Sequence, residues 1–109
     1  MPLPTVAEFI DAVRSKSASI MLLGNGLVEF ADVFHESGSY VDVILADYLG
    51  RITYYQDGFA DIEIIDADGN QIIWKHIEQI DGVERLVEEF HELCSALNTY
   101  AQSGRIESA

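Results

Sequence analysis

Apolar residues near the N-terminus of the chain recur every three or four positions, at Val6, Phe9, Ile10 and Val13. That spacing places them on one side of an α-helix. Thr5 followed by Glu8 has the spacing of a capping box, the usual signature of a helix start. The pattern therefore predicts a short amphipathic helix over residues 5–16.

Between residues 19 and 77 the pattern changes to short segments rich in β-branched and aromatic residues, separated by turn residues. Apolar and polar positions alternate within several of these segments, as they do in strands with one buried face. The predicted strands are Ile20–Leu23, Leu27–Phe34, Tyr40–Asp47, Arg51–Gln56, Phe59–Ile65 and Gln71–Ile77, with a turn at Gly24-Asn25-Gly26 and a break at Gly50. Because the connections are short, we expect an antiparallel meander of five or six strands.

The last segment returns to helical spacing. Its apolar residues form one stripe with steps of three and four, at Val83, Leu86, Val87, Phe90, Leu93, Cys94, Leu97 and Tyr100. Gly104 is predicted to end this helix. The fold class is therefore α+β, in which an N-terminal helix and a long C-terminal helix pack on an antiparallel sheet and leave its other face free. We expect residues 1–109 to form a single domain.

Charge narrows the classes of partner. The chain has 19 Asp and Glu against 6 Lys and Arg, a net charge of −13. Eleven of the acidic residues lie within residues 57–92, where only Lys75 and Arg85 oppose them. Such a surface repels nucleic acid and anionic membranes, so neither is expected as a partner. It attracts basic proteins.

The remaining composition bears on location and on chemistry. No apolar run is long enough to span a bilayer, the start of the chain lacks a secretion signal, and a single cysteine fits a reducing compartment, so a cytoplasmic location is expected. A calcium loop that began at Asp66 would need Gly at its sixth position and Glu at its twelfth, where the chain has Gln71 and Ile77, so a β-turn is predicted there. Cys94 is predicted to be a core residue. We expect no catalytic residue, metal or cofactor.

The acidic residues supply the candidate binding sites. Asp61 and Glu63 share one strand face at a spacing of two, and Asp57, Asp66 and Asp68 flank that strand in its turns. A second candidate patch on the exposed side of the last helix consists of Glu88, Glu89 and Glu92.

Aromatic residues on neighbouring predicted strands are the candidates for an apolar anchor, namely Tyr54, Tyr55, Phe59 and Trp74. Tyr55 or Trp74 would take this role if its ring is exposed. Apolar residues lie on both faces of the segment 71–77, so periodicity leaves open whether Trp74 belongs to the core.

The stretch from Gly50 to Asp66, followed by Asp68-Gly69 and by Ile73–His76, resembles the TriTu-type immunity proteins of bacterial polymorphic toxin and contact-dependent growth inhibition systems. The resemblance covers residues 40–97 and includes the apolar stripe of the last helix. It implies a non-catalytic cytoplasmic protein that binds and neutralises a toxin domain delivered by a neighbouring cell.

The leading hypothesis combines this resemblance with the charge. The protein is expected to bind the C-terminal domain of its cognate toxin one to one. That domain would be a basic nuclease, in particular an RNase, whose substrate-binding surface the acidic residues cover. The alternatives are an acidic DNA mimic that inhibits a DNA-binding protein, a small enzyme or ligand-binding domain that uses a carboxylate pair, and a structural subunit.

Overall fold

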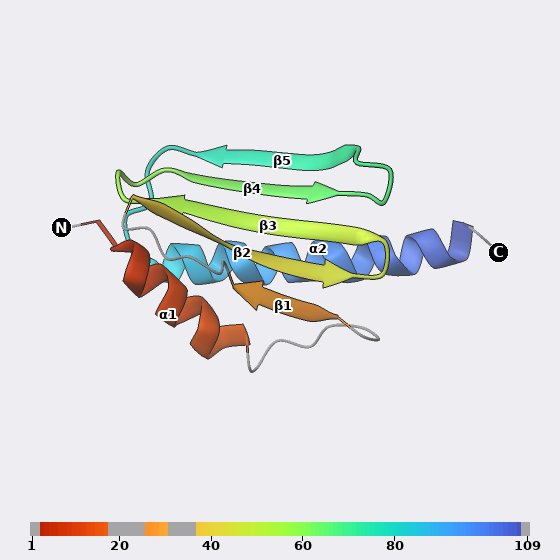
Figure 1. Ribbon diagram of the computed structural model, residues 1–109, viewed down its shortest axis with the longest axis horizontal. Coiled ribbons are helices and arrows are strands. Elements are labelled where there is room, and N and C mark those ends of the chain that lie inside the picture. The colour runs from red at the N-terminus through yellow and green to blue at the C-terminus, as the bar shows by residue number, and fades with distance from the viewer. Residues whose placement is uncertain (1–2, 18–25, 31–36, 108–109) are drawn as a thin grey trace.

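Two helices and five strands make up the part of the chain that the computed structural model describes, residues 3–17, 26–30 and 37–107. They follow in the order α1 (Val6–Ser17), β1 (Leu27–Phe30), β2 (Gly38–Leu45), β3 (Tyr48–Tyr55), β4 (Ala60–Ile65), β5 (Gln71–Ile77) and α2 (Val83–Glu107). The strands form one antiparallel sheet whose spatial order is the chain order, with β1 and β5 at its edges (Figure 1). The predicted α+β meander is confirmed. Outside the described residues lie the predicted strand Ile20–Leu23, Gly24 and Asn25 of the turn after it, and residues 31–34 of the predicted strand Leu27–Phe34.

The capping box predicted at the start of α1 is present. The Thr5 N–H donates to Glu8 Oε1 at 2.8 Å, and the Glu8 N–H donates to Thr5 Oγ1 at 3.0 Å. The buried Tyr54 hydroxyl donates to the Pro4 carbonyl at 2.6 Å, and the Tyr54 ring packs against Phe9. The start of α1 is therefore attached directly to the middle of the sheet.

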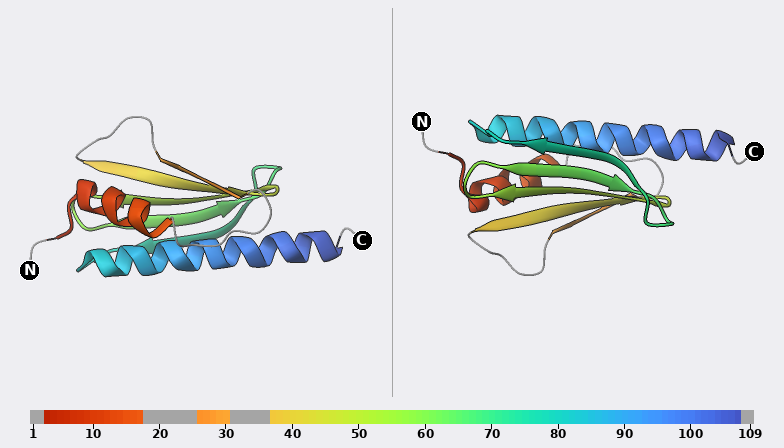
Figure 2. Two further views of the ribbon diagram at one scale, coloured as in Figure 1. Left: turned by 90° about the horizontal axis from the view of Figure 1, so that it is seen from below. Right: turned by 90° about the horizontal axis from the view of Figure 1, so that it is seen from above.

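Both helices pack on the same face of the sheet. α2 runs along this face (Figure 2) and contacts β3 most, with fewer contacts to β2 and β4, while α1 contacts α2, β2 and β3. The core between the layers is formed by inward-facing strand residues such as Val41, Ile52 and Ile64 and by helix residues such as Phe9 and Phe90. In β2, β3 and β4 buried and partly exposed positions alternate, because only one face of the sheet is covered.

Gly50 was expected to interrupt the sheet, and that prediction is wrong. Strand β3 runs through it, pairs Gly50 with Val43 and Ile64, and begins at Tyr48 instead of Arg51. A Cβ atom at position 50 would lie 2.9 Å from Leu97 Cδ1 and 3.0 Å from Leu93 Cδ1. The glycine therefore marks the place where α2 approaches the strand backbone most closely, a known role of glycine within strands.

Replacing Gly50 with valine is expected to lower the free energy of unfolding by about 1–3 kcal/mol, the usual cost of overpacking. Leu93 and Leu97 are themselves buried and have little room to move aside. Urea unfolding of the two proteins measures the effect. Thr53→Val, on the face of the same strand that the helices leave uncovered, is the matched control and should change stability by less than about 0.5 kcal/mol. An unchanged midpoint for Gly50→Val would show that the helix does not pack this closely.

The C-terminal helix differs from the prediction only at its end. α2 continues past Gly104 to Glu107, since an isolated glycine lowers helix stability without preventing the helix. Cys94 lies in the core as predicted, 1% exposed, and burial raises the pKa of its thiol to about 11. A thiol in this state is a poor nucleophile at neutral pH.

Candidate partner-binding surface

The face of the sheet opposite the helices carries the first group of predicted acidic residues. Asp61 and Glu63 alternate with the buried Ile62 and Ile64, so their side chains point away from the core. The strand register places Asp61 opposite His76 and Glu63 opposite Trp74 on the edge strand β5. We call this area, from β3 across β4 to β5, the free face.

A row of aromatic side chains borders these acidic residues. Trp74 is 59% exposed and stacks on His76, with a centroid distance of 6.0 Å and an angle of 11° between the rings. His76 in turn stacks on Phe59 at 5.6 Å. Beside them, Tyr55, Asp57, Phe59 and His76 line an open cleft of about 260 Å³. The free face therefore combines exposed apolar rings with carboxylates.

The structure separates the aromatic residues that the sequence analysis grouped together. Tyr54 is fully buried against α1, whereas Tyr55, on the other face of the same strand, is 38% exposed. Partial burial raises the pKa of the Tyr55 hydroxyl, and the charge of Asp61 and a hydrogen bond to it raise it further. Tyr55 and Trp74 are thus the two aromatic residues available as anchors on this face.

Most of the acidic residues on the free face already have partners. Asp61 Oδ1 lies 2.5 Å from His76 Nδ1, and Glu63 Oε2 accepts a hydrogen bond from Gln71 Nε2 at 2.9 Å. Arg51 forms a bidentate ion pair with Asp42 on the neighbouring strand. These contacts fix the direction of the side chains, and the carboxylates of Asp61 and Glu63 remain partly accessible to a binding partner.

The acidic residues in the turns lie at opposite ends of β4, so the five predicted acidic residues do not form one cluster. Asp57 lines the same cleft as His76, the partner of Asp61. Asp57 lies in the turn before the strand, and Asp66 and Asp68 lie in the turn after it. The Asp66 carboxylate accepts the backbone N–H groups of Asp68 and Asn70 at 3.0 and 2.9 Å. The hydrogen bonds from Asn70 and Asp68 lower the pKa of Asp66. The predicted β-turn is present, and Asp66 stabilises it.

Glu89 was expected on the exposed side of the last helix, and that expectation is wrong. Its side chain is buried and accepts hydrogen bonds from Lys75 Nζ at 2.9 and 3.0 Å and from Arg85 Nε at 2.9 Å. Burial raises the pKa of Glu89, but the hydrogen bonds from Lys75 and Arg85 outweigh this effect, so the pKa is lowered overall. Glu89 is therefore a structural ion-pair residue that joins α2 to β5.

Replacing Glu89 with glutamine is expected to lower the free energy of unfolding at pH 7 by about 1–3 kcal/mol, because two cations lose their buried partner. The pKa of Glu89 is lower in the folded state than its unfolded value of 4.5. The carboxylate therefore contributes its full stabilisation of the fold above pH 4.5, and this stabilisation is lost as the pH falls through the folded-state pKa. Urea unfolding between pH 7 and pH 3 should show the two proteins converging at low pH. The exposed neighbour Glu88, changed to glutamine, is the control. A pH-independent difference would contradict the ion-pair explanation.

The other two acidic residues of the helix patch are exposed as predicted. Glu88 and Glu92 lie one turn apart on α2, and Glu92 approaches Lys75 Nζ at 3.8 Å. Lys75 belongs to β5, so this patch lies beside the inner face of the edge strand, while Asp61 and Glu63 lie beside its outer face. The tertiary structure thus places acidic residues on both sides of β5.

Sequence reasoning did not select His76 or Ile72 as part of the surface. His76 connects the stacked rings of Trp74 and Phe59 and pairs with Asp61, and Ile72 is 38% exposed on the same strand. The spacing of two between Ile72, Trp74 and His76 is visible in the sequence. Whether the face that these three residues share is exposed depends on which face of the sheet the helices cover.

Two further features concern other kinds of site. Among the described residues, no group of three or more His, Cys, Asp or Glu side chains is arranged to hold a metal ion. No helix in the described ranges is long and apolar enough to cross a membrane.

Together the fold and its free face define a small α+β protein with an open surface of aromatic and acidic side chains. The family model described as Immunity protein TriTu matches residues 8–96. The chain therefore belongs to the TriTu family of immunity proteins, and this membership implies a toxin as its partner. No curated protein and no solved structure matches the chain.

Proposed function

We propose that this immunity protein binds its cognate toxin domain one to one across the free face and β5. The toxin domain is a basic nuclease, in particular an RNase. The carboxylates of the immunity protein occupy the positions that substrate phosphates take on the free nuclease, so the complex excludes substrate. The immunity protein needs no catalysis of its own for this inhibition.

The exposure of Trp74 is the observation that carries the proposal. A tryptophan that is 59% exposed in the free protein, and that lies opposite Glu63 on the neighbouring strand, resembles the aromatic anchor residues of protein interfaces. Its stacking on His76 restricts the motion of the ring, and such restriction lowers the entropy lost on binding. The partner would cover this ring with an apolar or cationic group.

The net charge supports a basic partner. With a charge of −13, the protein attracts a basic domain over a distance of about 10 Å in about 0.1 M salt. Such attraction raises association rates from about 10⁵–10⁶ M⁻¹s⁻¹ towards about 10⁸ M⁻¹s⁻¹ or more. Fast association matters when a toxin arrives in an active form.

Co-expression with the C-terminal domain of the protein encoded immediately upstream tests the proposal. We expect a one-to-one complex, rescue of growth, and loss of the RNase activity of the isolated toxin domain. Trp74 is the single tryptophan of the immunity protein, so its fluorescence should shift to shorter wavelength when it is covered. Association should be faster in about 0.1 M than in about 0.5 M salt.

Other outcomes of this experiment would reject part or all of the proposed function. A complex that forms without any nuclease activity in the toxin domain would retain the immunity role and reject the nuclease. Failure to form a complex or to rescue growth would reject the cognate pair. Binding to a DNA-binding protein instead would support the DNA-mimic alternative.

A further inference from the structure

Strand β5 is more exposed than a strand of a packed sheet usually is. In β2, β3 and β4 three or four residues of each strand are buried, in alternation with more exposed ones, but in β5 only Ile77 is buried. Ile72 and Trp74 are exposed, and Lys75, which points towards α2, is exposed as well. The outer edge of β5 pairs with no other strand among the described residues. Proteins normally protect a strand edge of this length from pairing.

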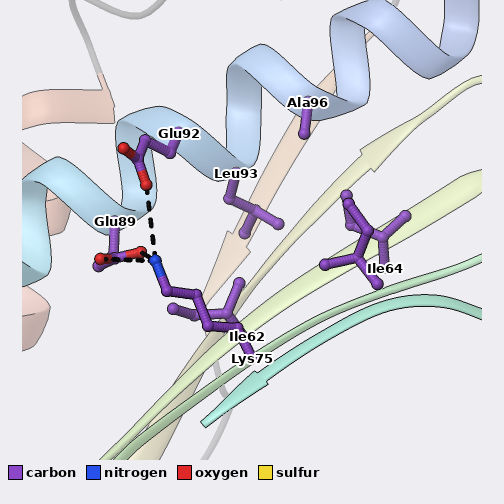
Figure 3. A pocket seen from close by; sticks show the side chains of 8 residues that line it. Ile62, Ile64, Lys75, Glu89, Glu92, Leu93 and Ala96 are labelled. Atoms are coloured by element: carbon purple, nitrogen blue, oxygen red, sulfur yellow. Dashed lines mark hydrogen bonds and ion pairs between the residues drawn. The ribbon is translucent and has the colours of Figure 1, made fainter. Parts of the chain in front are cut away.

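An apolar cleft of about 200 Å³ lies along the inner face of β5, beneath α2. Figure 3 shows Ile62 and Ile64 on the strand side of this cleft and Leu93 and Ala96 on the helix side. Ile73 of β5 completes the apolar wall. At one end Lys75 extends across to Glu89 and Glu92, so its charge is neutralised there.

An extended segment paired to the outer edge of β5 would use both faces of this strand. Side chains alternate between the two faces of a sheet, so every second residue of the added strand would lie on the side of the cleft. The residues between them would lie on the free face near Trp74 and Glu63, which favour a cationic side chain.

The acidic charge around β5 indicates which kind of chain could pair with its outer edge. Acidic residues lie on both sides of β5, at Asp61 and Glu63 on the free face and at Glu92 on α2. A second copy of this chain would bring a further −13 against them. A strand with alternating basic and apolar residues complements both the charge and the cleft.

We propose that the toxin domain adds an extended segment to the outer edge of β5, with apolar side chains in the cleft and basic side chains on the free face. This inference rests on the proposed function, because the segment belongs to the same basic partner. The toxin then contributes a sixth strand to the sheet of its immunity protein, and Trp74 lies within the contact.

Ala96→Trp tests the use of the cleft, because the added ring fills it without removing any charge or strand residue. We expect this variant to bind the purified toxin domain at least about tenfold more weakly than the wild type, as measured by calorimetry. Ser95→Trp adds the same ring at the preceding position, whose side chain is exposed, and this variant should bind within about threefold of the wild type. Thermal unfolding of both variants reports whether they are folded.

Hydrogen exchange on the wild-type protein tests the strand pairing independently of any variant. In the complex the amides of β5 should exchange at least about tenfold more slowly than in the free protein. The amides of β1, the other edge strand, are the internal control and should keep their rates.

The outcomes separate the two proposals. A one-to-one complex with unchanged β5 exchange, or with full affinity for Ala96→Trp, would overturn the strand addition and leave the immunity function in place. A homodimer of the free protein that protects β5 would assign this edge to a second copy and also overturn the inference. If the wild-type protein forms no complex at all, the proposed function fails, and the strand addition fails with it.

Discussion

Replacing Trp74 with alanine is expected to weaken binding to the toxin domain by about 30-fold or more, equivalent to about 2 kcal/mol. The ring is the largest exposed apolar side chain on the free face, and it lies on the strand that both proposals place in the interface. Because it is 59% exposed in the free protein, its removal should change the free energy of unfolding by less than about 1 kcal/mol. Isothermal titration calorimetry with the purified toxin domain measures the loss.

Leu27→Ala is the matched control for this variant. Leu27 is 52% exposed and lies opposite Ile44, on the strand at the other edge of the sheet. Its removal should leave the affinity within about threefold of the wild type. If Leu27→Ala weakened binding and Trp74→Ala did not, the interface would lie at β1, and the role assigned to β5 would be wrong.

Reversing the charge of Asp61 and Glu63 together, by Asp61→Lys and Glu63→Lys, is expected to slow association with the toxin domain by about 100-fold at low salt. The two carboxylates lie side by side on the free face, and lysines at these positions would repel a basic partner. The difference from the wild type should shrink as salt screens the charges. Stopped-flow measurement of Trp74 fluorescence at several salt concentrations gives the rates.

A second double variant separates local charge from total charge. Asp11→Lys with Asp47→Lys changes the net charge by the same amount, but at exposed positions on α1 and in the turn between β2 and β3. Its association rate should fall much less. Equal slowing in both double variants would mean that only the net charge matters, and would remove Asp61 and Glu63 from the interface.

Much of the architecture follows from local sequence features. Thr5 and Glu8 predict their own reciprocal hydrogen bonds, since a capping box needs only residues three apart. The alternation of Asp61 and Glu63 with isoleucines predicts their common exposed face in the same way. The acidic charge of the second half of the chain, and the family resemblance carried by residues 40–97, are also properties of the sequence itself.

The errors arose where a residue takes its role from a distant segment. Gly50 resembles a strand break in the sequence, but the nearness of Leu93 and Leu97 on α2 explains why a glycine lies there. Glu89 resembles its exposed neighbours, but the pairing of β4 with β5 and the packing of α2 bring Lys75 to it across fourteen positions of the chain. Neither contact has a local signature.

The order of helices and strands, the surplus of acidic residues and the family follow from the amino-acid sequence alone. The exposure of Trp74, the burial of Glu89 and the cleft beside β5 depend on how the helices pack on the sheet. Periodicity tells which side chains share a face, and this information is local. Which face is covered depends on where α1 and α2 pack, and that depends on the whole core.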